Sequence, residues 1–134
     1  MRVVIMGCGR VGAAVATRLS DEGHTVTVLD TDGFAFSRLP SRFTGTCLIG
    51  SGTDDRKLEE ADIRRADAFV ALASGDNRNI LAAQKAKHMF GVQIAVSRVK
   101  DPYRSELFDQ LGLRTFSPTK VGAELAYDSL FASP

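Results

Sequence analysis

Short apolar runs alternate with amphipathic stretches along the whole chain. The apolar runs are rich in Val, Ile, Leu, Ala and Phe and are bounded by glycine or polar residues, which is typical of strands buried on both faces of a sheet. The stretches between the runs are long enough to hold helices. The runs predict six strands: Arg2–Met6, Thr25–Leu29, Thr46–Ile49, Ala68–Ala73, Gln93–Val99 and Arg114–Phe116.

Apolar residues recur at helical spacing between the predicted strands. In Val11–Glu22 they share one face, and Gly23 follows as a helix-terminating residue. Asp101 and Pro102 are residue types favoured at the N-cap and first position of a helix. Further helices are predicted from an N-cap at Thr53 to about Ile63, over Asn77–Phe90, from Pro102 to Gly112 and over Thr119–Phe131, with at most a short helix or turn at Asp32–Pro40.

The regular alternation of strands and helices predicts an α/β fold. Parallel strands need crossover connections, and here the crossovers are helices. Right-handed crossovers then place helices on both faces of the sheet. We expect a Rossmann-like, doubly wound, six-stranded parallel sheet of order 3-2-1-4-5-6. Because no linker, repeat or low-complexity tract interrupts the pattern, residues 1–134 are predicted to form a single domain.

The composition is that of an ordinary globular protein. Of 134 residues, 44% are hydrophobic and 25% are charged, and the formal net charge is +1. These values exclude intrinsic disorder and indicate neither a nucleic-acid partner nor an anionic membrane surface. No apolar run approaches the roughly 18 residues of a membrane span, and the N-terminal run is interpreted as a buried strand rather than a signal peptide. We therefore expect a cytoplasmic domain without direct membrane insertion.

A G-x-G-x-x-G motif joins the first predicted strand to the first predicted helix. In that context Gly7 permits a tight turn, Gly9 lets a diphosphate approach the backbone, and Gly12 allows close packing of helix and strand. The free N–H groups and the helix dipole favour a negatively charged phosphate. The loop predicts an adenine-nucleotide or dinucleotide site with the candidate contacts Gly7, Cys8, Gly9, Arg10, Val11 and Gly12.

A carboxylate closes the second predicted strand. Asp30 follows Gly12 by 18 residues and is placed to accept hydrogen bonds from both ribose hydroxyls of an adenosine. Its negative charge repels a 2′-phosphate, which favours NAD or NADH over NADP(H). It does not distinguish NAD(H) from ATP, ADP or AMP, because all of them present the same ribose. Thr31 is included as a neighbouring contact.

Further candidate contacts follow from the expected topology, because ligands of such sheets bind beyond the carboxyl ends of the strands. Arg98 lies near the end of the fifth strand, where it could bind a phosphate or pair with Asp101. Arg10 could clamp a phosphate, cap the site across a dimer or remain solvated. Cys8 is either a thiolate stabilised by the helix N-terminus or simply a small residue beside phosphate. The loops after the third and fourth strands add Gly50, Ser51, Thr53, Ala73 and Ser74.

Catalytic and metal-binding residues are sparse. Cys8 and Cys47 are the only cysteines, neither has a partner at metal-ligand spacing, and His24 and His88 are predicted at the surface. No Tyr-x-x-x-Lys pair occurs. A nucleotide site without these groups favours a sensor over an enzyme, and no metal site is expected. The alternatives are the cofactor-binding half of an NAD-dependent dehydrogenase lacking its substrate domain, and an interaction module whose nucleotide site is inactive.

The last predicted helix, Thr119–Phe131, carries two apolar stripes. Val121 and Leu125 fall on one arc of a helical wheel, while Ala123, Ala126, Tyr127, Leu130 and Phe131 fall on the other. A surface helix needs one such stripe to cover its own core, so the second predicts contact with a partner. The alternatives are a helix set deeper in its own fold and a helix that covers a segment absent from this chain.

The combination of motifs resembles the N-terminal nucleotide-binding domain of potassium-transport regulators, known as TrkA-N or RCK-N. The resemblance covers essentially the whole chain. It rests on the order and spacing of VVIMGCGRVG at 3–12, VTVLD at 26–30, LIGSGTD at 48–54, SGDNRN at 74–79, SRVKDP at 97–102 and SPT at 117–119.

This resemblance implies a cytosolic domain that pairs with itself through its final helix and assembles into a homodimer or a larger ring. It implies regulation of a membrane potassium transporter or channel through NAD(H) or ATP/ADP. Ligand contacts are implied at Asp30, around Ser51–Thr53, at Ala73–Ser74 and at Arg98. The chain departs from the family at Ser51, where an acidic residue is frequent, and we expect no second, ligand-sensing domain within residues 1–134.

Overall fold

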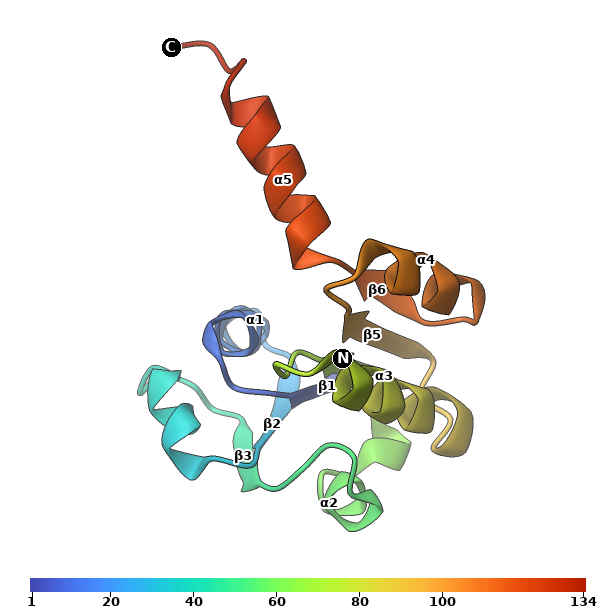
Figure 1. The fold of residues 1–134 in the computed structure, drawn as a ribbon. Helices are drawn as coiled ribbons and strands as arrows, with labels where there is room; N and C mark the ends of the chain where they lie inside the picture. The colour runs from blue at the N-terminus through green and yellow to red at the C-terminus, as the bar shows by residue number, and fades with distance from the viewer.

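A six-stranded, wholly parallel sheet runs through the molecule (Figure 1). The computed structural model describes all of residues 1–134. The strand order β3-β2-β1-β4-β5-β6 confirms the predicted topology. The strands are β1 (Arg2–Met6), β2 (Thr25–Asp30), β3 (Thr46–Ile49), β4 (Ala68–Ala71), β5 (Ile94–Arg98) and β6 (Arg114–Phe116).

Helices cover the sheet on both faces, as predicted. Side chains alternate along β1, so that Val4 and Met6 face one apolar cluster while Val3 and Ile5 face the other. The first cluster also takes apolar side chains from α2 and α3, and the second takes them from α1 and η1. The helical elements are α1 (Arg10–Asp21), η1 (Gly33–Arg38), α2 (Asp55–Glu60), η2 (Ile63–Arg65), α3 (Asp76–Gln84), η3 (Lys85–Met89), α4 (Pro102–Gln110) and α5 (Pro118–Ser129).

The helix after β3 differs from its prediction. Its N-cap is Asp54, whose carboxylate accepts a hydrogen bond from the Arg56 N–H at 2.9 Å, and not Thr53. The Thr53 hydroxyl lies one residue before the cap, within the preceding turn, 2.7 Å from the Ser51 hydroxyl. The helix also ends early, because Asp62 adopts a left-handed backbone with φ of 60°.

Two other boundaries differ for local reasons. β4 ends at Ala71 rather than Ala73, because the Ala73 N–H bonds to the side chain of Asn79 instead of a neighbouring strand. The single helix predicted over residues 77–90 is an α-helix followed by the π-helical turn η3. That turn is marked by the Phe90 N–H, which donates to the Lys85 carbonyl at 3.0 Å.

The last helix leaves the rest of the molecule, which we call the body (residues 1–117). In Figure 1, α5 projects away from the sheet, and every residue from 119 to 134 is exposed. Ser117 is buried and caps the helix, accepting a hydrogen bond from the Lys120 N–H at 3.3 Å. The chain contains no helix with the length and apolarity needed to cross a bilayer.

Candidate functional site

A cavity of about 260 Å³ opens beyond the carboxyl ends of the central strands. The loops after β1, β2, β3 and β4 and the end of β5 form its walls. Nine predicted contacts line it: Gly7, Gly9, Asp30, Thr31, Gly50, Ser51, Ala73, Ser74 and Arg98. Gly52, within the predicted Ser51–Thr53 segment, lines it as well, and four further lining residues were not predicted: Met6, Leu29, Leu72 and Arg78.

The three motif glycines have separable geometric roles. Gly7 has φ of +103°, and a Cβ there would lie 2.9 Å from backbone atoms of Leu72 and Ala73. A Cβ on Gly12 would lie 1.8 Å from the Gly7 carbonyl oxygen. A Cβ on Gly9, in contrast, would meet no atom within 4 Å. Gly7 and Gly12 therefore serve the fold of the loop, whereas Gly9 keeps open the space beside the N-terminus of α1.

Asp30 is fixed with its carboxylate toward the glycine loop. Its Oδ2 accepts a hydrogen bond from the Cys8 N–H at 2.8 Å, and its Oδ1 accepts one from the Asp32 N–H at 2.9 Å. A carboxylate has about four lone-pair sites, so each oxygen keeps acceptor capacity for a further donor. The side chain is partly buried and lines the cavity, which suits it to bind vicinal hydroxyls.

The loop after β3 is held in place by hydrogen bonds of its own and by a lysine from η3. Ser51 Oγ accepts a hydrogen bond from the Thr53 N–H at 3.1 Å. Lys85, in the π-helical turn, donates to the Thr53 carbonyl at 2.9 Å and to the Asp55 carboxylate at 2.9 Å. Thr53 does not line the cavity. It shapes the loop that carries Ser51.

Asn79 links two walls of the cavity and was missed in the sequence. It is fully buried, its Oδ1 accepts from the Ala73 N–H at 2.9 Å, and its Nδ2 donates to the Ala73 carbonyl at 2.8 Å. The same Nδ2 donates to the Arg98 carbonyl at 3.3 Å. An amide on the buried face of an amphipathic helix was the signal that could have identified it.

Two arginines meet the cavity on the β4–β5 side. Arg98 forms no ion pair, and its Nε is buried without a hydrogen-bond partner. The alternative pairing with Asp101 is wrong, because that carboxylate caps α4 by accepting from the Tyr103 N–H at 3.0 Å. Arg78 also lines the cavity and forms no ion pair. A carboxylate at one side and two guanidinium groups at the other suit an anionic ligand that carries a sugar.

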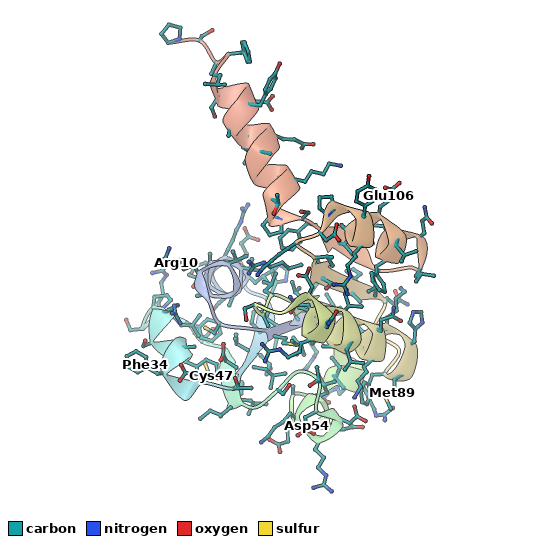
Figure 2. The ribbon with its side chains drawn as sticks, in the orientation of Figure 1. Arg10, Phe34, Cys47, Asp54, Met89 and Glu106 are labelled. Carbon is teal, nitrogen blue, oxygen red and sulfur yellow. The ribbon has the colours of Figure 1, made fainter.

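The remaining motif residues lie behind or beside the loop. Cys8 is fully buried, and burial together with the negative charge of Asp30 raises the pKa of its thiol, so it is a neutral thiol at pH 7 and not the thiolate considered from sequence. Arg10 is exposed and lies on the outer side of α1 (Figure 2), away from the cavity lining. Val11 and Gly12 begin α1 and do not line the cavity.

Neither histidine lies at the cavity. His24 Nδ1 is 3.0 Å from the N-terminal amine, and His88 belongs to the π-helical turn. Groups of three or more His, Cys, Asp or Glu that could hold a metal ion are absent from the structure. The cavity offers backbone donors, hydroxyls, one carboxylate and two guanidinium groups.

Sequence comparison extends this picture. The TrkA-N domain family matches residues 3–118. The Trk system potassium uptake protein TrkA of Streptomyces coelicolor is 48% identical over 124 residues, which cover 92% of this chain and 56% of that protein. A TrkA homologue of Pyrococcus abyssi is 36% identical over 111 residues, covering 83% of this chain and 49% of the homologue. The chain therefore spans about half the length of these relatives.

Solved structures share the fold at low sequence identity. The TrkA-N domain of the inner membrane protein YbaL from Escherichia coli superposes with a TM-score of 0.85 at 14% identity, covering 96% of each chain. The ADP-bound GsuK protein superposes with a TM-score of 0.79 at 22% identity, covering 95% of this chain and 33% of GsuK. At these identities the likeness extends to the fold alone.

Proposed function

This chain belongs to the TrkA-N domain family, and from that premise we propose that it is an adenine-nucleotide-sensing regulatory domain of a potassium transporter or channel. The observation that carries the proposal is the cavity that joins Gly9, Asp30 and Arg98 at the carboxyl ends of three strands. Relatives named as Trk system potassium uptake proteins support the transport role.

The ligand we propose is NAD(H) or one of ATP, ADP and AMP. The open space at Gly9 accommodates the diphosphate against the N-terminus of α1. The Asp30 carboxylate accepts hydrogen bonds from the adenosine ribose and repels a 2′-phosphate. The nucleotides named for two structural neighbours, AMP for a Kef C-terminal domain and ADP for GsuK, support an adenine nucleotide.

Regulation requires that ligand binding change how copies of the domain are arranged. We propose that α5 packs against a second copy, because Leu125, Leu130 and Phe131 are 62%, 77% and 72% exposed. A second exposed apolar row on α4 and its C-cap residue, formed by Tyr103, Leu107 and Leu111, supports assembly of dimers into a ring. A nucleotide that binds one arrangement more tightly shifts the population toward it, and a pore subunit at the inner face of the membrane responds.

The substitution Asp30→Ala tests the nucleotide site. It removes the ribose acceptor and is expected to weaken adenine-nucleotide binding by about 1–3 kcal/mol, the value of a charge-assisted hydrogen bond. Titration calorimetry measures the loss, and mass spectrometry of the purified protein identifies retained nucleotide. Asp128→Ala, an exposed carboxylate on α5, is the matched control and is expected to bind as the parent does.

Two outcomes would contradict the proposal. Equal nucleotide affinity for the parent and for Asp30→Ala would mean that the ribose is held elsewhere. Loss of nicotinamide absorbance when the protein is incubated with NADH and a panel of carbonyl compounds would indicate a dehydrogenase instead.

A further inference from the structure

The terminal helix α5 is hydrogen-bonded to the rest of the chain through a single residue. That residue is Ser117, which is buried, donates its hydroxyl to the Lys100 carbonyl at 2.7 Å and caps α5. No hydrogen bond or ion pair joins residues 118–134 to residues 1–116. The direction in which α5 leaves the body therefore depends on where Lys100 holds Ser117.

Lys100 is itself held by the helix that borders the cavity. Its N–H donates to both oxygens of the Asp76 carboxylate, each at 3.0 Å. Asp76 is the first residue of α3, whereas Ser117 immediately precedes α5. Lys100 therefore bridges the starts of two helices, with its N–H bound to one of them and its carbonyl bound to the other.

The first turn of α3 also borders the cavity. Ser74, just before the helix, and Arg78, in its first turn, both line the cavity. The backbone of this turn is closed by the Asn79 N–H, which donates to the Gly75 carbonyl at 3.0 Å, so its residues move together. A ligand that draws Ser74 or Arg78 toward itself also displaces the carboxylate of the same turn, and Lys100 with it.

Open space lies beside the base of α5. Lys120, Val121 and Glu124, from its first two turns, line a hollow of about 700 Å³ together with residues of α4 and β6. Because no residue of α5 is buried, a tilt of the helix disrupts no buried side chain. The hydrogen bond from Ser117 to Lys100 is thus the restraint that sets the direction of the helix.

We propose that Asp76, Lys100 and Ser117 form a relay by which a nucleotide in the cavity changes the direction of α5. The inference rests on the proposed nucleotide-sensing function and names the route of its regulation. The two hydrogen bonds of Asp76 hold Lys100, and through it Ser117, in one arrangement. A bound nucleotide displaces the first turn of α3, and these bonds carry the displacement to the base of α5. Asp76 lies outside the cavity lining and is a positioning residue.

The length of α5 amplifies a small movement at its base. Asp128 follows Ser117 by 11 residues, which corresponds to about 16 Å at a helical rise of about 1.5 Å per residue. A tilt of about 15° at Ser117 therefore moves Asp128 by about 4 Å. The nucleotide favours the tilted direction to the extent that it binds that state more tightly. In a dimer joined by α5, the tilt changes the angle between the two bodies.

Distances between two spin labels test the relay in the full chain. Gln93→Cys, exposed before β5, and Asp128→Cys, exposed on α5, carry the labels. Cys47→Ser removes the exposed native thiol, whereas Cys8 is buried. Labelled chains are mixed with an excess of unlabelled chains, so that each distance lies within one chain. The tightest-binding of ATP, ADP and NAD⁺, identified by titration calorimetry, is added at saturation and should shift the label distance by about 4 Å.

Variants at both ends of the relay separate it from a general loosening of α5. Asp76→Ala removes the acceptor of the Lys100 N–H without touching the cap of α5, and the nucleotide-dependent shift should be lost. Ser117→Ala removes the bond to the Lys100 carbonyl and should lose the shift as well. Asp76→Asn retains one acceptor oxygen and should keep the shift. Asp54→Ala is the matched control, because Asp54 accepts a backbone N–H at the start of α2 and has no bond to Lys100.

The behaviour of the variants decides between the relay and other routes. Loss of the shift in both Asp76→Ala and Ser117→Ala, with nucleotide still bound, supports the relay. A shift of unchanged size in Asp76→Ala overturns it, as does loss of nucleotide binding in that variant, which would make Asp76 part of the site. Absence of a shift in the parent with nucleotide bound also overturns the relay and leaves nucleotide binding intact. Failure of all three nucleotides to bind overturns the proposed function together with the relay.

Discussion

The cavity edge and the terminal helix differ in where their contacts come from. At the cavity, Asp30, Asn79 and Lys85 each hold a loop of this chain through two or more hydrogen bonds to other parts of the same chain. In α5 no residue is buried. Its one aromatic contact, between the rings of Tyr127 and Phe131 at 5.1 Å, stays within the helix and its end.

The side chains of the two regions therefore have different structural roles: those at the cavity hold this chain's own loops, and those of α5 do not. The walls of the cavity are tied to one another within the body by hydrogen bonds of Asp30, Asn79 and Lys85. The apolar side chains of α5 gain nothing from the body of their own chain. Their burial depends on contacts with other protein surface, so substitutions in the two regions should separate stability from assembly.

The largest expected effect is that of Gly12→Ala. The added Cβ would lie 1.8 Å from the Gly7 carbonyl oxygen, and backbone on both sides leaves no flexible atom to move. We expect the free energy of unfolding to fall by about 3 kcal/mol or more, measured by urea denaturation. Gly9→Ala, where the Cβ meets open space, is the control and should keep its stability while losing nucleotide affinity. Comparable destabilisation in both variants would contradict the separate roles of the two glycines.

Asn79→Ala is expected to have the next largest effect. The change leaves the Ala73 N–H and carbonyl without their buried partners, which costs about 2–3 kcal/mol of unfolding free energy. Nucleotide affinity should also fall, because the loop carrying Ser74 is released. Asn77→Ala serves as the control, since Asn77 is exposed and accepts one hydrogen bond from Arg104. A stable Asn79 variant with normal affinity would show that the loop is held by other contacts.

The smallest effect on stability is expected in α5. The double variant Leu125→Glu with Leu130→Glu should change the unfolding free energy of the body by less than about 0.5 kcal/mol, as for exposed sites in general, when measured on monomer. Analytical ultracentrifugation should show loss of the dimer, with Glu124→Gln as the control. A variant that remains dimeric would place the interface outside α5.

The fold was predictable because its signals are local and repeated. The runs that form β1, β3 and β6 have the predicted bounds, and the order of the sheet follows from the chirality of crossover connections. The glycine motif, and Asp30 at 18 residues after Gly12, correctly identified the part of the cavity lining that lies at the ends of β1 and β2. The N-cap predicted at Thr53 and the strand end predicted at Ala73 were wrong, because side chains distant in sequence, Lys85 and Asn79, bond to the loops that contain them.

The amino-acid sequence by itself determined the alternation of buried strands and amphipathic helices, the glycine loop and the carboxylate that faces it, because hydrophobic period and glycine conformation act over a few residues. Tertiary structure alone decided that Arg78 lies beside Gly75 at the edge of the cavity, that Asn79 links the ends of β4 and β5, and that α5 stands clear of the body. These arrangements depend on contacts between side chains that come together only when the sheet forms. A short-range sequence pattern does not predict such contacts.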